Sequence, residues 1–509
     1  MNSTVLTAPW VLGLTLVSLA VITWIGVWSY RRTRTTRDFF IAGQNVGLLA
    51  TGLATMAAAF SGFVFLGGPG LTYRLGTASL AIVLPVGFTA GLLCWSLARR
   101  LRLLAEIREI FTIPDAIACR FDSPLTTGLA IFAVLVGVVG YLGAQFLALA
   151  ILLESLFSMR EILGVWSLPV ALLLGCAVVL LYSVLGGMVA GVYTDVVQGV
   201  LMLLAALLVF GRALWVGGGV RQMVASVAGS ERFSGFFDPL GEGVALTTLG
   251  FFLVFGIGVL GQPHMLHKFY MIKDPRQLRW IPLILAGSQA ICLLIWVGVG
   301  LAVPALVARG QMTPLLVADD AAPRFLLEYG TPALSGLVVT AIVAAIMSTA
   351  DSFLNIGSAA VVRDLPRLLG AQVSEKLSHA RWATVGIAMA AAGLALIYDD
   401  LVALLGTFAF GTLGAALAPA LAVGLNWKRV TAAAASAAIA TGLVVSLSLE
   451  LVKHLSPSGT LVEMGLDAGA LPAAVALMAS LSVLMMMSWL TGSDDGQDIA
   501  ADVLAVMEN

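Results

Sequence analysis

Charged residues are scarce in this sequence. Asp, Glu, Lys and Arg make up 11% of the 509 residues, whereas 60% of the residues are hydrophobic and the mean hydropathy is +1.01. Soluble globular proteins carry about 25% charged residues, so this deficit excludes a soluble fold. No basic tract exceeds the length of an ordinary loop, and we therefore expect no nucleic-acid partner.

Cysteine is equally rare, with four residues in the whole chain. Each of them stands alone in or beside an apolar segment, and none belongs to a CxxC or Cys/His spacing: Cys94, Cys119, Cys176 and Cys292. Disulfide frameworks and zinc sites depend on such spacings. We interpret the four cysteines as small core residues and predict neither a disulfide nor a transition-metal site.

Nucleotide-binding signatures are missing as well. The sequence contains no GxxxxGK[ST] phosphate loop and no kinase-like signature, which argues against a pump driven by ATP. A channel, a secondary transporter or an intramembrane enzyme remains possible on these grounds.

Long apolar runs, by contrast, occur along almost the whole chain. A helix needs about 20 apolar residues to cross the hydrocarbon core of a membrane, and on this basis we predict about thirteen spans. They form a single transmembrane domain over residues 1–492, followed by a short acidic tail over 493–509. The expected spans are 8–30, 46–72, 77–98, 125–157, 163–184, 188–212, 244–270, 281–306, 332–358, 382–398, 401–425, 430–452 and 470–491.

The distribution of basic residues predicts the orientation of the chain. Cytoplasmic loops carry an excess of Lys and Arg, and most of the 27 basic residues fall on one face of the predicted topology. We therefore place the N-terminus outside and the tail from Asp494 in the cytoplasm, in a cell inner (plasma) membrane. The first span lacks a basic n-region and precedes RRTRTTR, which indicates a retained helix instead of a signal peptide. The cations counted on the cytoplasmic face are Arg31, Arg32, Arg34, Arg37, Arg99, Arg100, Arg102, Arg108, Arg120, Lys268, Lys273, Arg276, Arg279, Arg363, Arg367, Lys376, Arg381, Lys428 and Arg429.

Two of the predicted spans are interrupted by glycine and proline. The first contains Ser61-Gly62 and then GGPG over 67–70, and the second contains Gly256, Gly258 and Gly261 before Pro263. Gly and Pro are poor material for a continuous helix. Interrupted spans in corresponding positions of two halves are typical of inverted-repeat transporters, whose binding site lies at the membrane midplane. Alternatively, the glycines only allow helices to pack closely.

Polar residues interrupt the apolar span 332–358 in the stretch AIMSTADSFLN, residues 345–355. Helical spacing puts Ala345, Ser348, Thr349 and Ser352 on one face, with Asp351 beside it. Carbonyl and hydroxyl oxygens are ligands for a hard cation such as sodium, and an unwound turn near residues 57–62 is a candidate for the opposite wall. Alternatively, the hydroxyls bond to carbonyls one turn earlier, and Asp351 lies near the cytoplasmic mouth of the span.

A second carboxylate, Asp195, occurs with Gln198 near the inner end of the span 188–212. A carboxylate within a membrane span usually faces a partner or a water-filled path. Asp195 either pairs with an ion leaving toward the cytoplasm or caps the helix start after Thr194.

Three stretches of the sequence, YSVLGGMVAGVYTDVVQ, GQPHMLHKF and AAIMSTADS, resemble motifs of the sodium/solute symporter family. The resemblance covers about residues 35 to 430. The resemblance implies an all-α membrane protein with a LeuT-type five-plus-five inverted repeat and two broken helices. It assigns the repeat core to 46–425, an extra N-terminal helix to 8–30 and two C-terminal helices to 430–491. It also implies that the chain is a transporter and not an enzyme, which imports a small organic solute such as an amino acid or carboxylate with sodium by alternating access.

The resemblance also implies site residues. The main sodium site would use Ala57, Phe60, Ala345, Ser348 and Thr349, and a second sodium site, present in some members, would use Asp195, Ser348, Asp351 and Ser352. Candidate solute contacts are Tyr141, Gln145, Phe255, Val259 and Gln262. Proline symporters of the family carry an aspartate where this chain has Ala59 and an aromatic residue where it has Val259, which argues against proline as the solute.

The expected partners are the solute, sodium and membrane lipid, with no cofactor besides sodium and no obligate protein partner. Two alternatives remain open from the sequence. One is proton coupling through Asp195 or Asp351, and the other is a transporter-like sensor that signals through a separate partner.

Overall fold

The computed structural model describes residues 2–30, 41–240, 245–373, 377–398, 402–455, 470–492 and 499–508. Within these ranges the chain forms helices and no β-strand, apart from one bridge between Val46 and Ile272, so the predicted all-α class is confirmed. The basic stretch 31–37 and residues 493–498 of the predicted tail lie outside the described residues.

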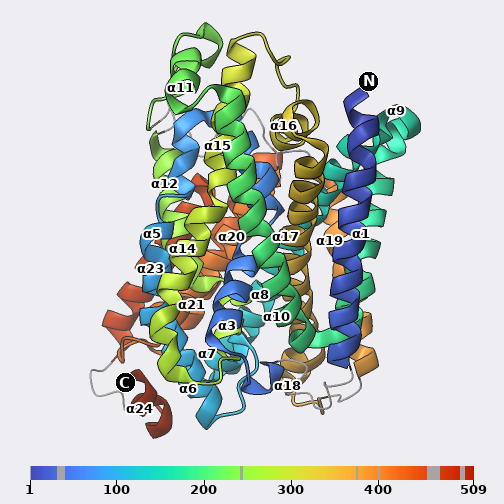
Figure 1. Cartoon of the computed structure of the whole chain (residues 1–509). Coiled ribbons are helices and arrows are strands. Elements are labelled where there is room, and N and C mark those ends of the chain that lie inside the picture. The colour runs from blue at the N-terminus through green and yellow to red at the C-terminus, as the bar shows by residue number, and fades with distance from the viewer. Residues whose placement is uncertain are drawn as a thin grey trace.

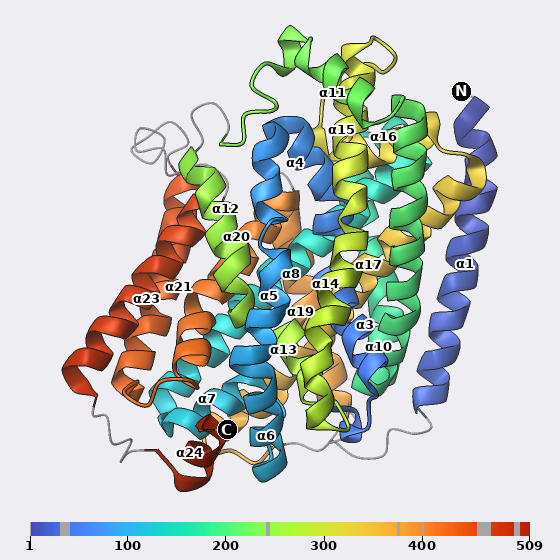
Figure 2. The same cartoon turned by 60° about the vertical axis from the view of Figure 1, so that its left-hand side comes forward.

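The helices form one bundle whose two ends are marked by short helices (Figures 1 and 2). One end carries α11 (Val220–Ala228) and the start of α1 (Asn2–Tyr30), and we refer to it as the α11 end. The other carries α24 (Ala501–Met507) and is called the α24 end. The described chain therefore begins and finishes at opposite ends of the bundle.

Ten helices in the described ranges are long and apolar enough to cross a membrane, or up to twelve if each of two bent pairs is one span. The helices that form these ten spans are α1, α8 (Pro124–Phe157), α10 (Ser167–Gly217), which holds two of the ten, α14 (Ile281–Cys292) with α15 (Leu294–Ala308), α17 (Pro332–Ala359), α19 (Leu377–Ile397), α20 (Val402–Ala418), α21 (Ala432–Leu455) and α23 (Leu471–Thr491). Shorter helices are α7 (Ile113–Phe121), α9 (Met159–Leu163), α16 (Ala321–Tyr329) and α18 (Leu365–Leu368). Short 3₁₀ or π-helical segments are η1 (Ala42–Gln44), η5 (Gly164–Trp166), η6 (Glu231–Phe233), η8 (Pro275–Trp280), η9 (Ala318–Asp320), η10 (Ala360–Asp364) and η11 (Pro419–Val423).

The predicted number of thirteen spans is not confirmed, because the stretch expected over 77–98 is divided into short pieces. They are η3 (Gly76–Ile82), α5 (Val86–Leu93), η4 (Cys94–Ala98) and α6 (Arg99–Ile107). Gly76 has φ +59, a left-handed angle that glycine adopts without strain. α10, in contrast, joins two predicted spans, with a kink at Gly187 (φ 59, ψ −165).

Both predicted breaks are present. The first separates α3 (Leu48–Ala59) from η2 (Phe63–Gly67) and α4 (Gly68–Leu75), with a bend of 56°. The second separates α12 (Ala245–Ile257) and η7 (Gly258–Gly261) from α13 (Pro263–Phe269), with a bend of 43°. Figure 2 shows α3 and α13 toward the α24 end, and α4 and α12 toward the α11 end. The two pairs thus run in opposite directions through the bundle.

The helical conformation is interrupted at Phe60 and at Gln262, and not at the GGPG stretch. Phe60 (φ −99, ψ 120) and Gln262 (φ −87, ψ 102) are extended, whereas Gly67 and Gly68 keep helical angles. Pro69 lies in the first turn of α4, directly after the helical turn η2. Gly68 is needed for packing, since a Cβ there would lie 2.3 Å from the Trp296 ring.

Four cations that the sequence analysis counted on the cytoplasmic face are buried side chains. Lys268 is 1% exposed, and Arg102, Arg120 and Arg363 are also buried. Arg102 donates to the Ile272 carbonyl at 2.8 Å, and Arg120 donates to the Gly424 carbonyl at 2.8 Å. These four cations are thus not solvated side chains, because they donate to backbone carbonyls or to carboxylates inside the bundle.

The described part of the acidic tail is a docked helix. Val503, Val506 and Met507 of α24 are buried, and Asp502 accepts two hydrogen bonds from Arg108 at 2.7 and 2.8 Å. The hydrogen bond from Arg108 lowers the pKa of Asp502, so the ion pair is present at neutral pH and is lost as the pH falls through that pKa.

Candidate functional site

The polar stretch of α17 lies against the end of α3. Ala345, Ser348 and Thr349 are buried, as are Ala57 and Phe60. The Thr349 hydroxyl lies 3.1 Å from the Ala58 carbonyl oxygen and 3.5 Å from the Phe60 carbonyl oxygen. These carbonyls are available because α3 ends at Ala59. The structure therefore brings Thr349 to the first break, with Ala58 as its nearest carbonyl where the sequence analysis named Ala57.

Ser348 faces a different partner, the carboxylate of Asp195 on α10. Its hydroxyl donates to Asp195 Oδ1 at 2.6 Å. The second carboxylate oxygen, Oδ2, accepts from Lys268 Nζ of α13 at 2.7 Å, and both side chains of this ion pair are 1% exposed. Three helices thus meet at one buried carboxylate.

The sequence analysis missed Lys268 as a site residue. It occurs in the stretch GQPHMLHKF, which was singled out as a motif, but the residue was counted only among the cations of the cytoplasmic face. A lysine five residues after the helix-starting Pro263 lies within α13. This position could have identified Lys268 as a site residue, since a charge inside a membrane helix needs a partner.

The other two residues of the predicted second sodium site lie one turn along α17. Asp351 Oδ2 approaches the backbone of Gly191, where a Cβ would come within 2.6 Å of it. Gly191 precedes Asp195 by one helical turn, so both carboxylates face the α10–α17 contact. Ser352 is buried, and its hydroxyl has no hydrogen-bond partner.

Three of the five candidate solute residues form hydrogen bonds at the two breaks. Gln145 Oε1 of α8 accepts from the Gly62 N–H at 3.0 Å, and the Tyr141 hydroxyl lies 3.4 Å from Ser61 Oγ. At the second break, Gln262 Nε2 donates to the carbonyls of Gly258 and Phe410 at 3.1 and 2.8 Å. Gln145 Nε2 and Gln262 Oε1 remain buried without hydrogen-bond partners, so one amide donor and one amide acceptor are available near the breaks.

Aromatic rings join the two breaks to each other. Phe255, one of the predicted solute residues, stacks on Phe63 with centroids 5.4 Å apart and on Phe410 at 4.7 Å. Phe63 also contacts Trp296 edge-on at 5.8 Å. Val259, the remaining candidate, is buried in η7. Phe63, Trp296 and Phe410 were not predicted, because they belong to three distant segments and only the fold brings them together.

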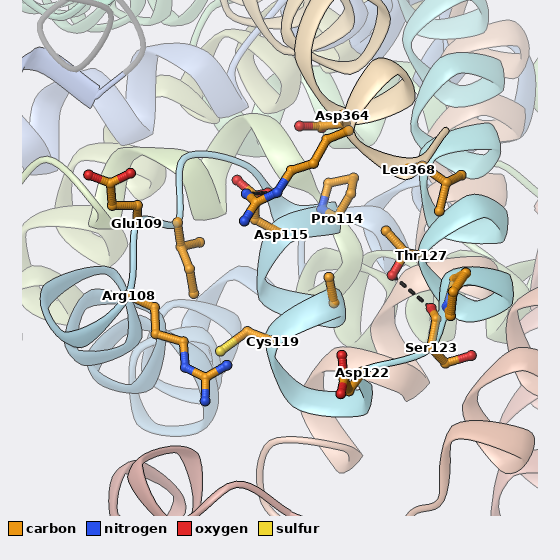
Figure 3. Close-up of a pocket in the computed structure, with 14 residues that line it drawn as sticks. Arg108, Glu109, Pro114, Asp115, Cys119, Asp122, Ser123, Thr127, Asp364 and Leu368 are labelled. Carbon is orange, nitrogen blue, oxygen red and sulfur yellow. Dashed lines mark hydrogen bonds and ion pairs between the residues drawn. The ribbon is translucent and has the colours of Figure 1, made fainter. Parts of the chain in front are cut away.

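A separate pocket of about 350 Å³ lies toward the α24 end (Figure 3). Asp115 on its wall caps α7, accepts from the Phe111 N–H at 2.9 Å, and forms ion pairs with Arg363 and with Arg367, the latter at 3.2 Å. This network ties α7 to η10 and α18. The pocket residues are Arg108, Glu109, Ile110, Pro114, Asp115, Ala118, Cys119, Asp122, Ser123, Pro124, Thr127, Asp364, Arg367 and Leu368, none of which was a predicted site residue.

Cys119 on the wall of this pocket is expected to react slowly with alkylating reagents. Burial raises the pKa of its thiol to about 11, and the thiolate is the reactive form. At pH 8 its alkylation should be roughly a hundredfold slower than that of a free thiol with a pKa near 8.5, and the rate should rise as the pH approaches 11. Peptide mapping by mass spectrometry measures the rate, with glutathione in the same buffer as the reference. Equal rates at pH 8 would contradict the assignment.

Comparison with known proteins adds to this geometry. The model of the sodium:solute symporter family matches residues 39–442. The osmoregulated proline transporter OpuE of Bacillus subtilis (strain 168) is 28% identical over 452 residues, which cover 86% of this chain and 87% of the relative. The high-affinity proline transporter PutP of the same organism is 28% identical over 431 residues, with coverages of 82% and 87%.

Two solved structures have a similar fold. The substrate-bound, outward-open state of a Na⁺-coupled sialic acid symporter superposes with a TM-score of 0.76 at 18% identity and covers 94% of this chain and 97% of its own. MhsT in complex with L-phenylalanine superposes with a TM-score of 0.55 at 16% identity, with coverages of 86% and 98%.

Proposed function

Since the chain belongs to the sodium:solute symporter family and is thus a multi-pass, sodium-coupled symporter of a small solute, we propose that its sodium ion binds between α17 and the end of α3. The ligands are the carbonyls of Ala57, Phe60 and Ala345 with the hydroxyls of Ser348 and Thr349. The observation that carries this proposal is the Thr349 hydroxyl at 3.1 Å from the Ala58 carbonyl and 3.5 Å from the Phe60 carbonyl.

The hydrogen bonds of the site suit a cation. The Ser348 hydroxyl donates a hydrogen bond to Asp195, which leaves the lone pairs of its oxygen free for an ion. Neutral oxygens suit a monovalent cation that must be released in each cycle. Because α3 is half of a broken helix and α17 is continuous, sodium at this contact favours the conformation in which the two helices are close. A solute that favours the same conformation is thereby coupled to sodium.

The proposed solute site lies between the two breaks. Tyr141 and Gln145 hold the first break and Gln262 holds the second, while Phe255 and Val259 supply an apolar wall. These five side chains carry no formal charge, which favours a solute without net charge, such as a zwitterionic amino acid. The relatives named as proline transporters make proline the first solute to test, although Ala59 and Val259 argue for different contacts.

We also propose the organisation and orientation of the chain. The inverted-repeat core comprises 46–425, and the opposite directions of the two bent pairs support it. The helices within 8–30 and 430–491 flank this core. The N-terminus is outside, the tail is cytoplasmic, and the bundle is surrounded by lipid of the plasma membrane without an obligate protein partner.

Transport by purified protein in proteoliposomes tests the function. Labelled amino acids, with proline first, are offered under an inward sodium gradient, and accumulation is expected for at least one of them. Potassium in place of sodium and protein-free liposomes are the controls. Accumulation under a pH gradient without sodium would establish proton coupling instead, and tight solute binding without uptake would favour a sensor.

A further inference from the structure

Lys268 occupies the position next to Asp195 that a second cation would take. We propose that its ammonium group is a tethered substitute for a second sodium ion, so that this chain binds a single sodium ion, the one between α3 and α17. This inference rests on the proposed function and determines the ratio of sodium to solute. It replaces the second sodium site that the sequence predicted from Asp195, Ser348, Asp351 and Ser352.

The geometry around Asp195 leaves no carboxylate oxygen unused. Oδ2 accepts from Lys268 Nζ at 2.7 Å, and Oδ1 accepts from Ser348 at 2.6 Å. A sodium ion at the same carboxylate would compete with these two donors for its oxygens and would lie beside the Lys268 ammonium charge. The lysine is part of α13 and cannot leave the site as a free ion can.

Electrostatics oppose a second cation beside the first. Both members of the ion pair are 1% exposed, and a buried carboxylate is tolerated when a cation neutralises it. Sodium within a few ångströms of Lys268 would place two positive charges in a medium that screens them weakly. Asp351 is the other carboxylate at this contact, but one of its oxygens is directed at Gly191 of α10.

The lysine differs from an ion in one further respect, because its charge is covalently part of α13 and joins the helices whether or not sodium is bound. The pair connects α13 of the second broken helix to α10, and Ser348 extends the connection to α17. Any movement that separates α13 from α10 breaks the ion pair. A sodium ion would add to the free energy of separating these helices only while it is bound. The Lys268 ammonium group adds to that free energy in every transport cycle.

Counting sodium sites on the purified full-length chain tests the inference. Equilibrium binding of ²²Na⁺ should give one ion per chain for the wild type and two for Lys268→Met, whose Asp195 carboxylate lacks its cation. The matched control is the neutral double variant Asp195→Asn/Lys268→Met, which should bind one. Lys268→Arg keeps the charge and should also bind one.

Thermal unfolding provides a second measurement if Lys268→Met folds poorly. In choline chloride both Lys268→Met and Asp195→Asn should unfold at lower temperature than the wild type, since each leaves one buried charge unpaired. Sodium should raise the unfolding temperature of Lys268→Met more than that of the wild type, because it supplies the missing cation. Sodium should not raise the unfolding temperature of Asp195→Asn by this additional amount. Equal sodium effects on the two variants would overturn the inference.

The outcomes separate this inference from the proposed function. No sodium binding by the wild type contradicts the proposed function itself. One ion bound by both the wild type and Lys268→Met leaves that function intact and refutes the tethered cation. Two ions bound by the wild type also refute it, because Lys268 would then not have replaced the second ion.

Discussion

Thr349→Val is expected to weaken sodium binding by roughly ten- to a hundredfold, which corresponds to about 1.4–2.7 kcal/mol. Valine keeps the shape of threonine and removes one proposed ligand oxygen. It also leaves the carbonyls of Ala58 and Phe60 without the hydroxyl that they face at 3.1 and 3.5 Å. Because this residue is fully buried, water cannot readily replace the lost oxygen.

Equilibrium binding of ²²Na⁺ measures this change, and sodium-dependent thermal stabilisation gives an independent value. Thr340→Val is a matched control on the same helix, since the Thr340 hydroxyl donates to the Gly336 carbonyl at 2.8 Å and lies 3.2 Å from Thr15 Oγ1. This variant should bind sodium as the wild type does. If both variants bind sodium equally well, the proposed site is in the wrong place.

Gly261→Ala is expected to destabilise the fold by about 1–3 kcal/mol or more. A Cβ at Gly261 would lie 2.7 Å from the Leu413 carbonyl oxygen, 2.8 Å from the Ala418 nitrogen and 3.0 Å from Gly414 Cα. These are backbone atoms of α20, which cannot rotate away as a side chain would. The second break would have to move from α20, and we expect both a lower thermal midpoint and slower transport.

Gly287→Ala in α14 separates this clash from the general effect of adding a methyl group. Nothing lies within 4 Å of a Cβ at Gly287, and alanine is favoured over glycine in a helix interior by about 0.5–1 kcal/mol. The thermal midpoint of this variant should be unchanged or higher. A Gly261→Ala protein as stable as Gly287→Ala would refute the close approach of η7 to α20.

Local patterns in the sequence were sufficient for the class of fold and for the position of the breaks. Span length follows from the thickness of the membrane, and extended backbone at Phe60 and Gln262 falls within or beside stretches rich in glycine and proline. Helical spacing similarly put Ser348 and Thr349 side by side on α17. Each of these properties depends on residues within a few turns of one another, which is why a single sequence determined them.

The partners of these residues were decided only by the tertiary structure. Asp195 and Lys268 are 73 positions apart, and Thr349 meets Ala58 across 291 positions. Its charge alone placed Lys268 among the cations of the cytoplasmic face, because the positive-inside pattern counts every lysine and arginine alike. Burial of its ammonium group is favourable only where the folded chain supplies a carboxylate at hydrogen-bonding distance, and no local pattern specifies that distance.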